Sequence, residues 1–200
     1  MTDFDNLTYE DKIKHYKSCL KKRLSKSRYH HSVCVANEAK SLAQENNYDE
    51  KKAYLAGLIH DVCKEESIEK QFELMSRSKT FIDDTEMTTK ALYHAIAGSV
   101  FIEEEFQISD EDIQNAVRYH TVGREGMSEL EKIVYLADLV SADRTYSDVK
   151  KYRKIAHQDL DIGMLEALKY SIKSNVNKEC RIVKSTLLAY NEYINKLIKK

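Results

Sequence analysis

Residues 53–61, Ala-Tyr-Leu-Ala-Gly-Leu-Ile-His-Asp, are an apolar run that ends on two polar side chains. A histidine and a carboxylate side by side can share a metal ion, because imidazole and carboxylate are both ligands of divalent metals. Four more residues of the same kinds, each isolated in its own segment, extend the set around His60 and Asp61: His31, His94, His120 and Asp138. The order His, His-Asp, His, His, Asp predicts a metal centre assembled from distant parts of the chain.

Helical spacing separates these positions from ordinary polar residues, because side chains three and four apart share one helix face. His31 falls in line with Val35 and Leu42, whereas its neighbour His30 aligns with polar positions. Asp138 lies in line with Leu130 and Val134. An unpaired carboxylate there would cost several kcal/mol in desolvation, so a positive partner is expected.

Simpler explanations exist for single members of the set. A lone histidine on an apolar face is more often a core side chain than a ligand, Asp138 could pair with Arg144, and His120 could only cap its helix before Gly123. Each of these alternatives explains one residue. The metal centre explains all of them together and is the preferred interpretation.

Composition favours an all-α fold in a single domain over residues 1–200. The chain has no proline and 5 glycines, and it is rich in Lys, Glu, Leu, Ala and Ile, which favour helix. Two hundred residues bury a sizeable core, roughly 70% of the unfolded surface. We therefore expect one compact helical bundle.

The charge balance and the cysteines exclude several classes of protein. A net charge of −1 gives no strong attraction for nucleic acid or an anionic membrane. No apolar stretch is long enough to span a bilayer, and the polar start MTDFDNLTYEDK lacks the features of a signal peptide, so the cytoplasm is the expected location. The four cysteines, Cys19, Cys34, Cys63 and Cys180, are too far apart for a zinc knuckle and are expected to be reduced core thiols.

Apolar spacing predicts a succession of helices. Thr8, Ser109 and Ser128 each precede an acidic residue by three positions and resemble helix caps. The expected helices cover Tyr9–Leu24, Arg28–Asn46, Asp49–Val62, Ser67–Met75, Met87–Phe106, Asp110–His120, Glu129–Ala142 and Asp161–Lys196. The loops Thr121–Met127 and Ser141–Lys151 each follow a candidate ligand and carry an arginine.

The donor set indicates hydrolysis at phosphorus. Nitrogen and carboxylate donors without thiolate suit iron, manganese, cobalt or zinc, and such ions activate water and stabilise charge on phosphoryl oxygens. Lys64 is expected to steady a phosphate or protonate a leaving oxygen, although it could be a plain surface lysine, and Asp61 joins it in the catalytic set. Further positive charge from Arg28, Arg124 and Arg144 favours a polyphosphate substrate.

The segments RYHH, GLIHDVCKE, RYHTVGREGMSELEKIVYLAD and SADR resemble the HD-domain superfamily, in particular its bacterial symmetrical bis(5′-nucleosyl)-tetraphosphatases. The similarity covers nearly the whole chain. It implies a compact helical domain with one or two iron ions, with manganese or cobalt as alternatives. It also implies symmetrical cleavage of diadenosine tetraphosphate to two ADP, and it is compatible with a homodimer.

The resemblance also assigns roles to individual positions. His31, His60, Asp61 and Asp138 match the principal metal ligands, and His94 and His120 match a second-site or phosphate-facing pair. The substrate-binding surroundings that it implies are Arg28, Lys64, Gly98, Thr121, Arg124, Asp143 and Arg144. Thr186 and Asn191 resemble a stretch that contacts the nucleotide, although the His-Pro pair common before it is Val183-Lys184 here.

Two other functions would fit the same ligand set. One is an HD-type nucleotidase or pyrophosphatase that acts on another nucleotide, and a product assay distinguishes it. The other is a non-catalytic nucleotide-binding regulator, which would bind ADP tightly without turnover.

Overall fold

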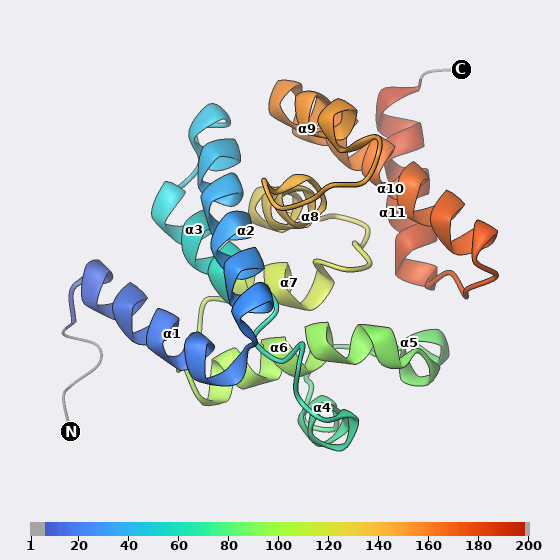
Figure 1. Ribbon diagram of the computed structural model, residues 1–200. Helices are drawn as coiled ribbons and strands as arrows, with labels where there is room; N and C mark the ends of the chain where they lie inside the picture. Colours follow the sequence, from blue (N-terminus) through green and yellow to red (C-terminus); the bar gives the residue numbers. More distant parts are fainter. Residues whose placement is uncertain (1–6, 199–200) are drawn as a thin grey trace.

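Helices account for all the regular structure of residues 7–198, the part of the chain that this computed structural model describes (Figure 1). Half of the polar start MTDFDNLTYEDK, residues 1–6, lies outside the described residues. The helices are α1 (Tyr9–Arg23), α2 (Lys26–Glu45), α3 (Glu50–Ile59), α4 (Ile68–Met75), α5 (Asp84–Thr88), the 3-10 turn η2 (Lys90–Leu92), α6 (Tyr93–Glu104), α7 (Glu111–Tyr119), α8 (Glu129–Val140), α9 (Val149–Gln158), α10 (Leu160–Asn177) and α11 (Lys184–Leu197). The predicted all-α class is confirmed.

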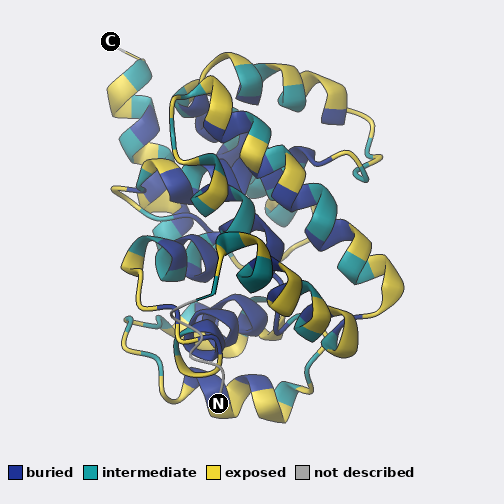
Figure 2. Cartoon of the chain, turned by 90° about the vertical axis from the view of Figure 1, so that its left-hand side faces the viewer, coloured by how far each residue is buried: buried dark blue, intermediate teal, exposed yellow. Residues whose placement is uncertain are grey.

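Helix α8 occupies the middle of the molecule. It packs against α2, α3, α7, α9 and α10, and Figure 1 shows it seen nearly end-on between the N-terminal and C-terminal helices. Leu130, Ile133, Val134 and Ala137 are completely buried along it. The outer helices carry buried residues on their inward faces and exposed residues outside (Figure 2). A carboxylate on α8, such as Asp138, is therefore held at the centre of the fold.

Side-chain caps start most of these helices, because the first backbone N–H groups of a helix have no partner within it. Thr8 accepts a hydrogen bond from the backbone of Asp11, and Ser128 forms a capping box with Glu131, as predicted. The prediction for Ser109 is wrong. Asp110 caps α7 instead, because its carboxylate accepts from the backbone N–H groups of Asp112 and Ile113.

Two expected helices are broken in the structure. The helix expected over Met87–Phe106 is divided at Thr89, whose hydroxyl bonds back to the carbonyl of Thr85 and competes with the helical ladder. The helix expected over Asp161–Lys196 is two helices. Helix α10 ends in a Schellman motif, in which Glu179 has a φ of 54° and the N–H of Cys180 bonds the carbonyl of Asn175.

Helix α9 was not predicted. Its buried positions are Val149 and Ala156, a pair too sparse to mark a helix by periodicity. The loop expected over Ser141–Lys151 is therefore shorter than predicted and ends at Asp148, before α9 begins. The expectation of core thiols holds for Cys63 alone, because Cys19 and Cys34 are partly exposed and Cys180 is exposed. Within residues 7–198, no helix combines the length and the apolar character that crossing a bilayer requires.

Candidate metal centre

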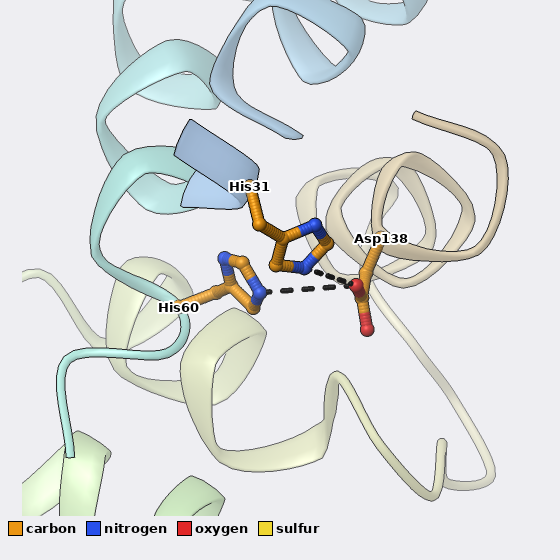
Figure 3. Close-up of side chains that lie close together, drawn as sticks. All are labelled: His31, His60 and Asp138. Atoms are coloured by element: carbon orange, nitrogen blue, oxygen red, sulfur yellow. Dashed lines mark hydrogen bonds and ion pairs between the residues drawn. The ribbon is translucent and has the colours of Figure 1, made fainter. Parts of the chain in front are cut away.

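Three helices bring His31, His60 and Asp138 together (Figure 3). His31 lies in the second turn of α2, His60 follows the last residue of α3, and Asp138 lies in the last turn of α8. The Nε2 atom of His31 is 3.0 Å from Oδ1 of Asp138, and Nε2 of His60 is 3.8 Å from the same oxygen. One donor atom from each of these residues lies within 4.8 Å of the other two, so they could share one ion.

A second group shares His60 and adds Asp61 and His120. Oδ1 of Asp61 lies 3.5 Å from Nε2 of His120 and 3.3 Å from Nε2 of His94. His120 follows the last residue of α7, and His94 lies in the first turn of α6. All six candidate ligands therefore lie in one cluster, which is mostly buried.

The histidine rings are held in one orientation by hydrogen bonds on their Nδ1 atoms. Nδ1 of His60 donates to the carbonyl of Gly57 at 2.7 Å, and Nδ1 of His120 donates to the carbonyl of Val117 at 2.7 Å. Nδ1 of His31 lies 2.8 Å from a carboxylate oxygen of Asp143. A histidine that donates through Nδ1 keeps its lone pair on Nε2, and this is the arrangement typical of metal-ligating histidines. The Nε2 atoms of these three histidines all face the carboxylates of Asp61 or Asp138.

The buried atoms of the cluster fit a bound cation. Nε2 of His60 and Oδ1 of Asp61 are buried and make no hydrogen bond. A buried polar atom without a partner destabilises the fold unless another group, such as a bound ion, interacts with it. Burial lowers the pKa of His60, but Asp61 and then Asp138 outweigh it and raise that pKa above its usual value. A site that stabilises positive charge on a fully buried imidazole also suits a divalent ion.

The difference in face between His30 and His31 is confirmed, because His30 is exposed and His31 is buried. The simpler contacts considered for single residues also occur. Arg144 pairs with the carboxylate of Asp138, and its Nε donates to the backbone carbonyl of Asp138 at 2.7 Å. His120 does occupy the C-cap position of α7. These contacts leave the Nε2 atoms of the histidines directed at the cluster.

Cationic side chains border the cluster. Arg28 pairs with Asp61 at 2.8 Å, and Lys64 is partly buried with its Nζ 3.2 Å from Nε2 of His94. Burial lowers the pKa of Lys64 below its usual range, which favours proton donation. Burial also lowers the pKa of His94 to about 4, so this imidazole is neutral near pH 7.

Other predicted substrate-binding residues make different contacts. Both oxygens of the buried Glu131 pair with the guanidinium of Arg124, and the hydroxyl of Thr186 donates to the backbone carbonyl of Val122. Asn191 is exposed on α11. A Cβ atom on Gly98 would lie 3.2 Å from Val117, so this glycine permits close packing of α6 against α7. Asp143 orients His31 through the contact described above.

A cavity of about 320 Å³ adjoins the cluster, and Thr121 lies on its wall beside His120, Asp138 and Arg144. Eight of the lining residues were not predicted as site residues, among them Tyr135, Tyr146, Tyr170 and Asn175. Tyrosine and asparagine at helical spacing resemble ordinary surface or core residues in the sequence. Tyr135 lies on α8 itself, whereas Tyr146, Tyr170 and Asn175 reach the cavity only because α10 and the segment before α9 pack against α8.

Comparisons with known proteins agree with this geometry. The HD domain family model matches residues 28–143, more than half of the chain. Two proteins named bis(5′-nucleosyl)-tetraphosphatase, symmetrical, are similar: one from Bacillus subtilis, 34% identical over 87% of this chain and 93% of its own, and one from Staphylococcus aureus, 30% identical over 94% and 98%. A crystal structure from Clostridium acetobutylicum, described as a predicted HD superfamily hydrolase involved in NAD metabolism, covers 92% of this chain and 97% of its own with a TM-score of 0.88 and 34% identity.

The family match includes all six clustered residues and ends just beyond the last of them, Asp138. The solved structure extends the agreement to nearly the whole helical arrangement. The motifs, the clustered histidines and aspartates, and the fold therefore lead to one assignment: the chain belongs to the HD domain family.

Proposed function

We propose that this chain is a metal-dependent hydrolase that cleaves dinucleoside tetraphosphates symmetrically, so that diadenosine tetraphosphate gives two ADP. The observation that carries the proposal is the common orientation of His31, His60 and His120. The Nδ1 atom of each ring makes a hydrogen bond, and the Nε2 atoms face the carboxylates of Asp61 and Asp138. The names of similar proteins that are 30–34% identical supply the substrate class.

The proposed principal ligands are His31, His60, Asp61 and Asp138, with His94 and His120 beside them. No cysteine belongs to either candidate group among the described residues, and such a nitrogen and oxygen set suits iron, with manganese or cobalt as substitutes. Because Nδ1 of His60 is already bonded, this residue offers one lone pair and serves one ion. When bound, such an ion activates water as a nucleophile and neutralises charge on phosphoryl oxygens.

The cationic residues would hold the polyphosphate. Arg28 and Arg144 pair with the carboxylates of the cluster, and we assign both to phosphoryl oxygens when substrate is present. Water attacks the phosphorus on one side of the central bridging oxygen, and the bond between that phosphorus and the bridging oxygen breaks. We assign to Lys64, which lies beside His94, the role of giving a proton to the departing ADP. The reaction consumes one water and yields two ADP.

A product assay tests the proposal. Full-length protein loaded with iron, manganese or cobalt under reducing conditions is incubated with diadenosine tetraphosphate in ¹⁸O-labelled water. Chromatography should show ADP alone, and mass spectrometry should find the label in half of it. Formation of AMP and ATP, or no turnover with any of these metals, would exclude this function. Turnover of other nucleotides in the second case would support the nucleotidase or pyrophosphatase.

A further inference from the structure

The cavity beside the metal centre extends well beyond the clustered residues. One end is bordered by His120, Asp138 and Arg144, and the other end reaches Ser174 and Asn175 in the last turns of α10. Its volume of about 320 Å³ is at the small end of the range for ligand pockets. This space suits one nucleoside better than an entire dinucleoside polyphosphate.

An aromatic wall lines the cavity. The rings of Tyr146 and Tyr170 are stacked, with centroids 5.2 Å apart and an angle of 23° between their planes. Tyr152 packs against both rings from outside the cavity, and the hydroxyl of Tyr146 donates to the carbonyl of Leu139. These contacts hold the wall rigid. A nucleobase stacks readily on such a surface, and any base can do so because every base has a flat π-face.

The end remote from the metal centre is polar and carries no charge. Ser171, Ser174 and Asn175 lie on one face of α10, which is the face that lines the cavity. An asparagine amide both donates and accepts hydrogen bonds, and this matches the edge of a base or the hydroxyls of a ribose. Ala167 and Leu139 supply an apolar floor.

The distribution of cations indicates which part of a nucleotide belongs in the cavity. Arg144, at the metal end, is the one arginine or lysine among the described residues that line it. Three lysines, Lys169, Lys173 and Lys178, line a neighbouring cavity on the far side of Tyr170. The cavity beside the metal centre therefore offers one cation at the reacting end and neutral groups elsewhere, which fits a nucleoside whose phosphates point toward Arg144.

We propose that the cavity lined by Tyr146, Tyr170 and Asn175 is a nucleoside subsite for one half of the dinucleoside polyphosphate. It differs from the stretch at Thr186 and Asn191 that the family resemblance implies, because neither of those residues lines it. A symmetrical substrate has two nucleosides, so the two places can take one each. The inference rests on the proposed function for the identity of the substrate.

Binding measurements with two ligands test the subsite. Titration calorimetry on the full-length, manganese-loaded protein compares ADP, which carries a nucleoside, with pyrophosphate, which carries none. Tyr170→Leu should weaken ADP binding by roughly tenfold, because base stacking is lost, and should leave pyrophosphate binding unchanged. Tyr54→Leu is the matched control: Tyr54 is also partly buried but lines a cavity between α1, α2 and α3.

Equal weakening of ADP and pyrophosphate, or no change for either, would overturn the subsite. Asn175→Leu repeats the test at a position near the surface if Tyr170→Leu does not fold, and the same selective loss of ADP is expected. Photo-crosslinking with 8-azido-ADP provides a direct measurement. The label should appear on the peptides that contain Tyr146 or Tyr170, and a label confined to α11 would contradict the proposal.

The outcomes separate this inference from the proposed function. A protein that converts diadenosine tetraphosphate to two ADP but binds ADP equally well with leucine at position 170 keeps the function and loses the subsite. A protein that binds ADP through Tyr170 but releases no ADP from the dinucleotide keeps the subsite and loses the function.

Discussion

At the scale of single residues, the clearest contrast lies between His30 and His31, which are adjacent in sequence but face solvent and the acidic cluster respectively. We expect His60→Ala and Asp138→Ala to lose most bound metal and activity, because each removes a donor from the cluster. His30→Ala should lose neither. Elemental analysis beside the product assay checks this, and a fully metallated, active Asp138→Ala protein would contradict the ligand assignment.

Lys64 tests the other half of the site. An ammonium group has donors and no lone pair, so Lys64 acts on phosphate or leaving-group charge and does not hold metal. Lys64→Met should keep metal content and circular dichroism, while turnover falls by roughly ten- to thousand-fold, as for other groups that stabilise a transition state. Steady-state kinetics provide the measurement. Near-normal turnover in a folded, metallated variant would show that Lys64 has no catalytic role.

At the scale of elements, one buried ion pair attaches α5 to α7. Arg118 is 1% exposed, its guanidinium forms an ion pair with the carboxylate of Glu86, and its Nε donates to the hydroxyl of Thr80. Arg118→Met leaves a buried carboxylate without its partner and should cost about 3–5 kcal/mol of unfolding free energy. Urea unfolding of the single variant and of the Arg118→Met, Glu86→Met pair checks this. The double variant should recover much of the unfolding free energy that Arg118→Met loses. If the single and double variants lost the same amount, the unpaired carboxylate would not be the cause.

A histidine joins α9 to α2. Nδ1 and Nε2 of His157 lie 2.6 Å and 2.9 Å from carboxylate oxygens of Glu45 and Glu38. Burial lowers the pKa of His157, but the hydrogen bonds with Glu45 and Glu38 outweigh burial and raise it. A raised pKa in the folded state means that this stabilisation is complete below the unfolded pKa of about 6.5 and disappears as pH rises through the folded value.

The contacts of His157 predict how the difference in melting temperature between the wild type and His157→Gln depends on pH. The melting temperature of the wild type should exceed that of His157→Gln near pH 6, by an amount that reflects about 1 kcal/mol or less, because the pair is partly solvated. The excess should shrink as pH rises above the folded pKa. Thermal melts from pH 5.5 to 9 measure this, and a difference that grows with pH would have the wrong sign.

At the scale of the whole molecule, the cluster of candidate ligands connects α2, the end of α3 and α8 across more than a hundred residues of sequence. An ion that binds only the folded state stabilises it by about 2.7 kcal/mol at a hundred times its dissociation constant. For a chain of this length, the melting temperature should rise by roughly 5–11 °C on addition of manganese or cobalt. Calorimetry checks the shift, which should vanish in Asp138→Ala.

Local patterns in the sequence were sufficient for the fold class and for the candidate ligands. The cap at Thr8, the capping box at Ser128 and the separation of His30 from His31 all depend on neighbours within four residues, so spacing alone predicted them correctly. The clustering of the six candidate ligands was also predicted, because a buried histidine or aspartate needs a polar partner and the other motifs supplied such partners. Whether the cluster binds metal remains a prediction.

The spacing of apolar residues missed two local features, and tertiary structure alone decided the rest. The breaks at Thr89 and Glu179 depend on side-chain and backbone hydrogen bonds to nearby residues, which periodicity does not register. The pairing of Arg124 with Glu131 and the wall formed by Tyr146 and Tyr170 require segments to meet in space. Helical periodicity records which face of one helix is buried, but the identity of what it is buried against is a property of the packed fold.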